Sequence, residues 1–250
     1  IRFGDEEFID RTELSIDEFY RRMRESEHLP ETAAPSPGQF AEAFSGLLDA
    51  GAETIVCINI SAALSATMQS AETAVKELDG DPDIRVVDSR SITAGLGAMV
   101  LAAAEAAAGG ASADDIVALV DDMSARTRVY GVLDTLENLK KGGRIGNAQA
   151  LLGSMLSIKP ALDLSSGEVE EAGKLRTRKK ALAWLRDRVV AEAKIEQLAV
   201  MHSMADDFET LRDMLSDTID VDTMRVGPIG AVIGTHGGPG VIGVAYTVAP

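Results

Sequence analysis

Apolar and polar positions in the first half of the chain predict a strand, a helix and a second strand in turn. The run Thr54–Ile60 is apolar and β-branched, and it lies between Gly51 and Ser61, which is typical of a buried strand. Ile84–Asp88 predicts a second strand, and Ser65–Leu78 between them has helical spacing. A strand–helix–strand unit implies a parallel pair joined by a right-handed crossover.

Two further helices are predicted after this unit, over Ser91–Ala108 and Ser112–Arg126, separated by a glycine pair. Ser112 followed by Asp115 resembles a capping box in which Asp replaces Glu. The Ala-rich block Ala98–Ala108 indicates a buried helix, because it is far shorter than the roughly 20 apolar residues that a membrane span needs. We therefore expect no stable membrane insertion.

The second half of the chain alternates strand-like runs with two helices. The predicted strands are Val129–Leu133, Ser157–Leu164, Glu168–Leu175, Gln197–Ser203 and Ile229–Gly234. The predicted helices are Lys179–Ala193 and Asp206–Leu215, and residues 165–167 suggest a hairpin. These patterns predict an α/β protein of two domains: a mostly parallel, Rossmann-like sheet domain at 1–126 and a mixed α/β sheet domain at 127–250.

Composition excludes several classes of protein. The net charge of −16 opposes binding to nucleic acid or to anionic lipid surfaces, since both need a basic face. The single cysteine, Cys57, rules out an internal disulfide and a cysteine-based metal cluster. The chain has no Gly-x-Ser-x-Gly elbow, no His-Glu-x-x-His and no signal peptide, so we expect a cytoplasmic protein without a metal site.

Two hydroxyl-rich segments are candidates for ligand binding. Ser36 suits the N-cap of a helix that begins at Pro37, which leaves the Thr32 hydroxyl available to a ligand. Ser61–Thr67 follows a buried strand and opens a helix, where free N–H groups favour a carboxylate. The alternative for this segment is that Ser61 or Ser65 only caps the helix.

Two basic segments and one histidine complete the candidates. In Lys140–Gly146, helix C-cap chemistry accounts for the lysines and Gly142 but does not require Arg144, which could bind an anion. Five cations in Lys174–Lys180 either form a solvated face or dock an acidic partner or a phosphate. His236 lies in a glycine-rich loop, where a lone histidine is more often structural than a ligand.

Taken in order, these segments resemble the DegV family of fatty-acid-binding proteins. The matching stretches are Phe3–Phe8, Thr32–Pro37, Ser61–Ser70, Asp88–Ser91, Leu136–Ile145, Ser157–Pro160, Arg176–Lys180 and His236–Gly243. The resemblance implies a two-domain α/β protein that buries an acyl chain between its domains. It also implies a first strand before Ile1.

The resemblance further implies a role for each candidate. Thr32 and Ser65 would hold the carboxylate with His236 close by, and Ser61 and Thr67 join them as ligand-binding residues. Arg144 and Arg176 would face a fatty acid kinase that makes an acyl phosphate from the bound lipid. On this reading the chain is a carrier with no catalytic residue, and the fatty acid is its ligand in place of any cofactor.

The sequence departs from the family pattern at two places near the proposed head-group site. Ala33 and Ala34 stand where the family has Ser-Gln, and Met68 stands where it has Tyr. Since Met is a more adaptable wall than Tyr, the preference for particular acyl chains is the property that we expect to differ from the family. Two alternatives stay open at this point. One is a substrate-binding subunit of a dihydroxyacetone-kinase-like enzyme, with His236 as a covalent carbonyl ligand, and the other is an adaptor that uses the basic patch alone.

Overall fold

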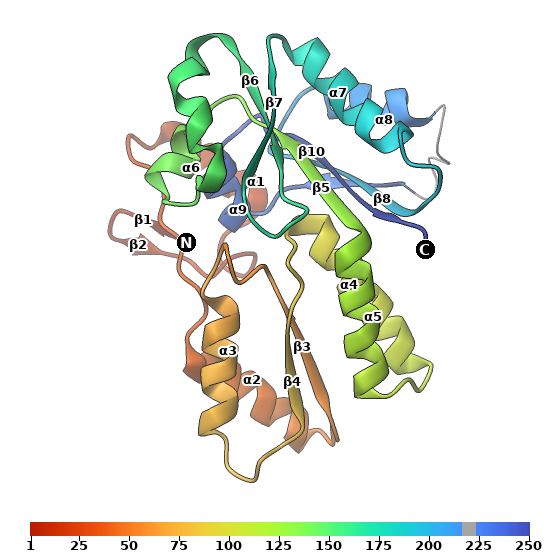
Figure 1. Cartoon of the computed structure of the whole chain (residues 1–250). Helices are drawn as coiled ribbons and strands as arrows, with labels where there is room; N and C mark the ends of the chain where they lie inside the picture. The colour runs from red at the N-terminus through yellow and green to blue at the C-terminus, as the bar shows by residue number, and fades with distance from the viewer. Residues whose placement is uncertain (217–223) are drawn as a thin grey trace. The chain divides into compact units, whose positions relative to one another are not determined.

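The computed structural model describes residues 1–216 and 224–250, and it describes their side chains except those of 152–157. The chain folds into two compact units (Figure 1). The first unit joins Ile1–Ala33 to Arg128–Pro250, and the second is Ala34–Thr127. The expected boundary after residue 126 lies beside the end of the second unit, whereas residues 1–33 lie with the C-terminal half instead of the 1–126 segment.

The second unit contains the predicted parallel pair and four helices. Its elements are α2 (Pro37–Asp49), β3 (Ile55–Asn59), α3 (Thr67–Glu77), β4 (Ile84–Asp88), α4 (Thr93–Ala108) and α5 (Ala113–Arg126). Strands β3 and β4 run parallel, with Ile55 opposite Ile84 and Asn59 opposite Asp88. The strand–helix–strand prediction is confirmed, because the local apolar pattern alone specifies each of the three elements.

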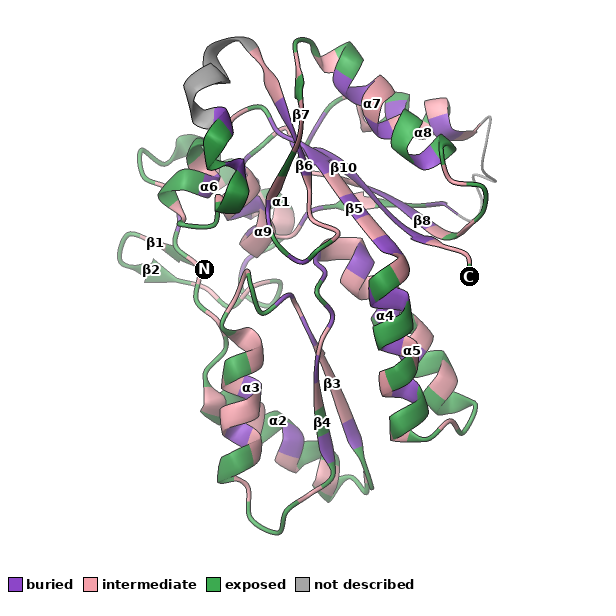
Figure 2. Ribbon diagram, in the orientation of Figure 1, coloured by how far each residue is buried: buried purple, intermediate pink, exposed green. Residues whose placement is uncertain are grey.

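Both faces of the β3–β4 pair carry an apolar cluster. Figure 2 colours the two strands and the helices around them by burial. On one face, Ile55 and Ile84 pack with α2 and α3 through Phe44 and two alanines of α3. On the other face, Val87 packs with α4 and α5. Successive strand residues point to opposite faces of a sheet, so a short apolar strand can serve two layers of helices.

Helix caps in the second unit follow the predicted chemistry. Ser36 accepts a hydrogen bond from the amide of Gln39, whose side chain in turn accepts from the Ser36 amide, and Pro37 is the first helical residue. Ser112 and Asp115 form the same reciprocal pair at the start of α5. Both capping boxes provide hydrogen-bond acceptors for amides at the helix start, which have no carbonyl partner within the helix.

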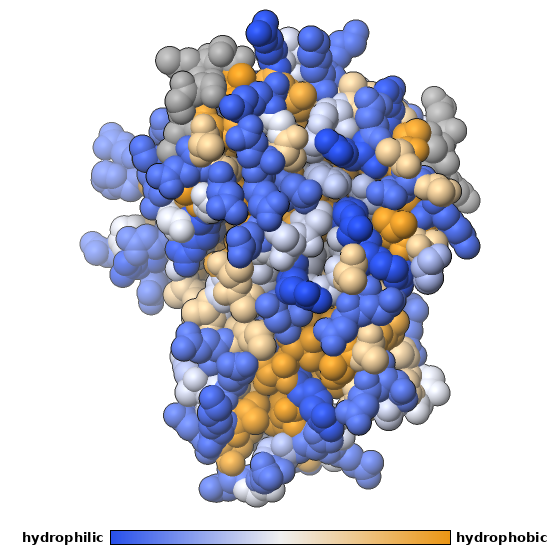
Figure 3. All heavy atoms as spheres, in the orientation of Figure 1, coloured by the Kyte–Doolittle hydropathy of each residue, from blue (hydrophilic) through white to orange (hydrophobic). Residues whose placement is uncertain are grey.

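Helix α4 is apolar on more than its buried face. Met99 is fully buried, but Val100 and Leu101 are 42% and 41% exposed. The helix therefore forms as expected, while only one side of it is buried. Apolar atoms also lie on the visible surface of the second unit in Figure 3.

The first unit is built on a six-stranded mixed sheet with the order β7-β6-β5-β10-β8-β9. The strands are β5 (Thr127–Val132), β6 (Lys159–Asp163), β7 (Glu170–Leu175), β8 (Ile195–His202), β9 (Met224–Pro228) and β10 (Ile242–Val248). The β5–β6, β6–β7 and β8–β10 pairs are antiparallel, and β8–β9 is parallel. The mixed sheet and the β6–β7 hairpin were both predicted.

Helices and a small hairpin complete the first unit. They are β1 (Arg2–Phe3), β2 (Glu6–Glu7), α1 (Ile16–Glu25), α6 (Glu137–Lys141), the 3-10 helix η1 (Gly146–Ser157), α7 (Arg178–Val190), α8 (Phe208–Ser216) and α9 (Ala231–Gly237). The main core lies between the sheet and helices α7 and α8, where Leu185, Leu211, Val200 and Val244 are almost fully buried.

The strand expected over Ile229–Gly234 is wrong. The chain forms helix α9 from Ala231, after Gly230 at its N-cap, and the neighbouring strands β9 and β10 were not predicted. A short apolar run of six residues fits either element, because periodicity cannot separate a buried strand from a buried helical turn. The helix packs closely on α1, since a Cβ at Gly234 would overlap the Tyr20 hydroxyl.

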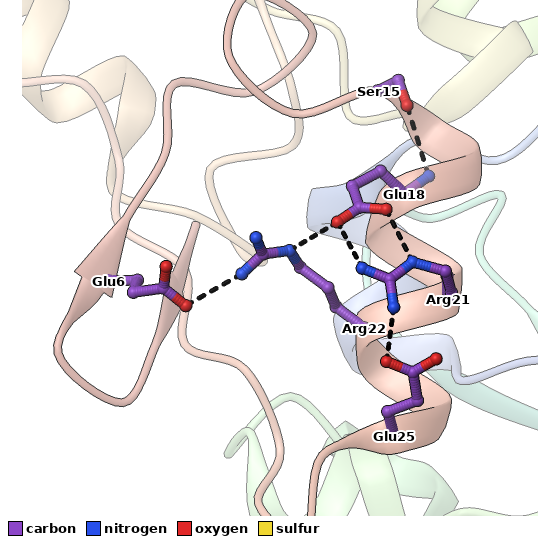
Figure 4. A network of polar contacts seen from close by, with 6 residues as sticks. All are labelled: Glu6, Ser15, Glu18, Arg21, Arg22 and Glu25. Atoms are coloured by element: carbon purple, nitrogen blue, oxygen red, sulfur yellow. Dashed lines mark hydrogen bonds and ion pairs between the residues drawn. The ribbon is translucent and has the colours of Figure 1, made fainter.

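Residues 1–33 join the first unit through α1. The inner side of this helix buries Phe19 and Tyr20 completely, in a cluster that includes Ala231 of α9. Its outer side carries an exposed ion-pair network in which Glu18 accepts from Arg21 and Arg22 (Figure 4). An amphipathic pattern of this kind lets one helix cover an apolar site while facing water.

Candidate functional site

Thr32 and His236 meet in the first unit. The Oγ1 atom of Thr32 lies 3.0 Å from Nε2 of His236, although the two residues are 204 positions apart. Paired backbone hydrogen bonds of 2.9 Å between Arg2 and Glu31 hold the chain immediately before Thr32. Helix α9 presents His236 from the other side. The structure thus brings together two of the residues that the sequence analysis placed around a carboxylate.

The imidazole of His236 is enclosed on its other side. Its Nδ1 atom is buried and has no hydrogen-bond partner in the described part of the chain. A Cβ at Gly142 would overlap Nδ1, so the ring rests where only glycine leaves room. One ring nitrogen faces Thr32 and the other is enclosed, which favours a supporting role over covalent attack on a carbonyl.

Burial lowers the pKa of His236, and the nearby charge of Arg144 lowers it further. Both effects disfavour the imidazolium, since desolvation and a like charge each destabilise the charged form. The ring is therefore neutral near pH 7. A neutral ring in which Nε2 carries the proton donates to Thr32 Oγ1, which leaves the Thr32 hydroxyl proton to be donated elsewhere.

Gly142 is a site residue that the sequence analysis explained by helix capping alone. It is the C-cap of α6, but its φ of −77° is open to any residue, so the cap does not demand glycine there. Gly143 is the residue with a positive φ, +68°. The sequence did hold a signal for the special role of Gly142. One glycine is enough to end a helix, so the presence of two in a row, Gly142 and Gly143, suggests a second reason for glycine here.

Arg144 lies beside this pair. Its Nη1 donates to the carbonyl oxygen of Gly142 at 2.7 Å, which folds the side chain back over its own loop. The family resemblance implies that Arg144 faces the kinase. The charge of Arg144 also acts on His236, whose pKa it lowers, and the assignment of Arg144 to the kinase-facing surface stays a prediction.

The basic run Lys174–Lys180 divides into two parts. Arg178 donates to both carboxylate oxygens of Asp207 at 2.8 Å and to the carbonyl oxygen of Gly240 at 2.8 Å. It therefore ties α7 to the loop after α9. Arg176 and Lys179 are exposed, and they remain available to a partner.

Ser65 and Thr67 meet in the second unit, at the start of α3. Their hydroxyl oxygens are 2.8 Å apart, and Ser65 Oγ accepts from the Thr67 amide at 3.3 Å. The N-cap position is Ala66, which makes no side-chain cap. Ser65 thus accepts from one amide at the start of α3, as the capping alternative expects, while its role as a carboxylate ligand stays a prediction.

Ser61 has a different environment. It is fully buried, and its amide donates to the Ser91 carbonyl at 3.0 Å. Its Oγ accepts from the amide of Ala63, and its carbonyl oxygen accepts from Leu64 and Ser65. Ser61 therefore organises the turn after β3, which separates it from the half-exposed Ser65 and Thr67.

The remaining histidines do not form a metal site. His28 is exposed, and His202 stacks on Phe208 with ring centroids 4.2 Å apart. Within residues 1–216 and 224–250, no group of three or more His, Cys, Asp or Glu could hold a metal ion. No helix in these same ranges is long and apolar enough to cross a membrane.

The chain is similar to known proteins along nearly its whole length. Residues 1–249 match the family model described as "Uncharacterised protein, DegV family". A DegV domain-containing protein of Streptomyces coelicolor is 38% identical over 248 residues, which cover 98% of this chain and 87% of that one. A DegV domain-containing protein of Deinococcus radiodurans is 36% identical over 250 residues, or 98% and 88% of the two chains.

Solved structures show the same fold. A DegV family protein of Thermus thermophilus, described for its fatty acid binding, superposes with a TM-score of 0.87 at 36% identity, covering 96% of this chain and 87% of that one. DegV of Bacillus subtilis, described as a fatty acid binding protein, gives 0.84 at 29% identity, with 99% and 89% covered.

Proposed function

Because this chain belongs to the DegV family, we propose that it binds one long-chain fatty acid and presents the carboxyl group to a partner fatty acid kinase. The observation that carries the proposal is its likeness, over 96% of the chain, to the fatty-acid-binding protein of T. thermophilus. The carrier supplies the lipid and the kinase supplies ATP chemistry, so the proposal assigns this chain no catalytic step. It places the protein in the cytoplasm, where ATP is available.

The energetics of such a ligand divide between its two ends. Each buried methylene contributes roughly 0.8 kcal/mol, so a long acyl chain supplies most of the affinity. The carboxylate costs free energy to bury unless donors replace its water. We assign that task to the hydroxyls of Thr32 and Ser65, with Thr67 beside Ser65 and His236 behind Thr32.

The hydrogen bond of 3.0 Å supports this division of roles. A carboxylate only accepts, so the Thr32 hydroxyl must donate to it. Thr32 can do so when its oxygen accepts from the Nε2–H of a neutral His236, the charge state that burial and Arg144 favour.

The kinase-facing part of the proposal rests on exposed cations. Arg176 lies with Lys179 and Lys180 at the start of α7, all exposed, in a protein whose net charge is −16. Arg144 is exposed at the end of the loop after α6. Cations of this kind steer an acidic or phosphate-bearing partner and change the association rate more than the lipid affinity.

The direct test is to denature the purified protein and identify the released molecules by mass spectrometry. One equivalent of a long-chain fatty acid is expected. Protein stripped of lipid should take up a fatty acid in a titration, and Thr32→Val, which keeps the shape of the side chain but lacks the hydroxyl, should bind it more weakly. Stripped protein that takes up no fatty acid would overturn the proposal.

A further inference from the structure

A buried hydroxyl pair holds helix α9 in the first unit. Tyr20 of α1 is fully buried, and its hydroxyl oxygen lies 2.9 Å from Ser203 Oγ and 3.0 Å from the carbonyl oxygen of Ile229. The carbonyl can only accept, so the phenol donates to Ile229 and the Ser203 hydroxyl donates to the phenol. All three polar groups are thereby satisfied without water.

These contacts bracket α9 at both ends. Ile229 directly precedes the N-cap Gly230, and its amide donates to the His202 carbonyl at 2.7 Å. After the helix, the Gly240 amide donates to the Ser203 carbonyl at 2.8 Å. Ser203 therefore contacts the chain after α9 through its backbone, and it supports the chain before α9 through Tyr20.

The middle of α9 is held by close packing against α1. A Cβ at Gly234 would overlap the Tyr20 hydroxyl and would lie 3.0 Å from the Phe19 ring, so α1 and α9 pack as closely as glycine allows. His236 follows two residues later on the same short helix. A small shift of α9 against α1 would therefore move the imidazole relative to Thr32.

We propose that Tyr20 and Ser203 are positioning residues for His236: they fix α9 so that Nε2 stays within hydrogen-bond distance of Thr32. This inference rests on the proposed function, because it makes α1 part of the support for the head-group site. Neither residue touches the Thr32–His236 hydrogen bond, so both act only through α9.

The chain offers a matched control for the test. Tyr246 is also buried, at 2% exposed, and its hydroxyl donates to the Arg188 carbonyl oxygen at 3.0 Å, the same distance as in the Tyr20–Ile229 contact. Tyr246→Phe and Tyr20→Phe both keep the ring; the first removes one hydrogen bond, and the second removes the two that join Tyr20 to Ile229 and Ser203. A general loss of stability affects both variants, whereas a role in positioning affects only one.

Two measurements separate the inference from the proposed function. Nitrogen NMR of the His236 ring in lipid-free protein, assigned with His236→Gln, reports the Nε2 environment without any ligand. Tyr20→Phe should shift that signal and weaken fatty acid binding by roughly threefold to tenfold, the equivalent of one hydrogen bond. Tyr246→Phe should change neither. Ser203→Ala removes only the Ser203–Tyr20 hydrogen bond, which matches the single bond lost in Tyr246→Phe, so it decides the question if Tyr20→Phe does not fold.

The inference is overturned if Tyr20→Phe and Ser203→Ala leave the His236 signal as it is in Tyr246→Phe. The NMR test stays valid even if wild-type protein binds no fatty acid, because the His236 ring signal is measured without a ligand. In that case the proposed function fails alone.

Discussion

The two units differ in their balance of acidic and basic side chains. Residues 34–127 carry fourteen acidic and four basic side chains, whereas the rest of the chain carries twenty-six and twenty. Nearly all the cations of the protein therefore belong to the first unit, together with all three histidines.

This difference limits what each unit can offer an anion. The second unit has neutral donors at the start of α3, the half-exposed hydroxyls of Ser65 and Thr67. The first unit has a neutral imidazole, an exposed guanidinium at Arg144 and the basic segment of α7. Each unit by itself thus offers neutral donors, while most of the charge that could attract an acidic partner belongs to the first unit.

The largest expected effect tests whether the units are also energetically separate. Leu185 is fully buried in the core between α7 and the sheet. Leu185→Ala should lower the free energy of unfolding by about 2–5 kcal/mol, because it removes packed atoms and leaves a cavity. Amide hydrogen exchange should speed up in β8 and β10 more than in β3 and β4.

Met99→Ala is the counterpart in the second unit, since Met99 is also fully buried. Its effect should fall on β3 and β4. Equal loss of protection in all four strands for either variant would mean that the two units unfold as one.

The next effect concerns the hydroxyls of the second unit. Ser65→Ala should weaken fatty acid binding by about 1.5–3 kcal/mol, the usual loss for a hydrogen bond to a charged group. Ser61→Ala should instead lower the melting temperature, because the buried Ser61 hydroxyl accepts from the Ala63 amide in the turn. Lipid titration and thermal unfolding of both variants check this, and equal losses of affinity would remove the distinction.

A smaller effect is expected for the cations of the first unit. Arg176→Ala should reduce acyl-phosphate formation with the kinase, in a salt-sensitive way, and leave lipid affinity unchanged. Arg144→Ala should do the same and also raise the pKa of His236, because a nearby positive charge is removed. Kinase assays, lipid titration and NMR of the ring measure these outcomes.

Arg212→Ala provides the control, since Arg212 belongs to the same unit and pairs with Asp213. It should alter none of the three readouts. If Arg144→Ala protein loses its lipid outright, Arg144 is a head-group ligand and the kinase-facing assignment fails.

The smallest effect is the dependence of stability on pH. The pKa of His236 is held below its usual value of 6.5 in the folded state. Below pH 6.5 the unfolded chain binds a proton that the folded chain does not, so stability falls as the pH drops towards the folded pKa. One such proton sets an upper limit of about 1.4 kcal/mol for each pH unit, and partial exposure of the ring reduces it.

His236→Gln should therefore lose less stability between pH 7.5 and 5.5 than wild type, as measured by denaturant unfolding. Burial lowers the pKa of His202 as well, but His202 is present in both proteins, so its contribution cancels. An equal acid dependence of the two proteins would show that His236 has an ordinary pKa.

Local helices, strands and caps could be predicted from the sequence, whereas contacts between residues far apart in the chain could not. The β3–α3–β4 order and the Ser36 and Ser112 caps follow from neighbouring residues, and so could be predicted. Helix α9 was mistaken for a strand because a short apolar run fits either element, and its packing against Tyr20, more than 200 positions away, leaves no mark on the local pattern. The same separation hides the Thr32–His236 hydrogen bond; the family resemblance implied only that His236 lies close to a carboxylate held by Thr32.

The joining of residues 1–33 to the C-terminal half has a consequence for synthesis. A ribosome releases α1 early, yet Tyr20 cannot meet its partners until Ser203 and Ile229 have been made. The second unit is contiguous, and its contacts are available once Thr127 has emerged. The apolar face of α1 therefore lacks these partners until Ile229 has been made, and its docking is a long-range step in folding.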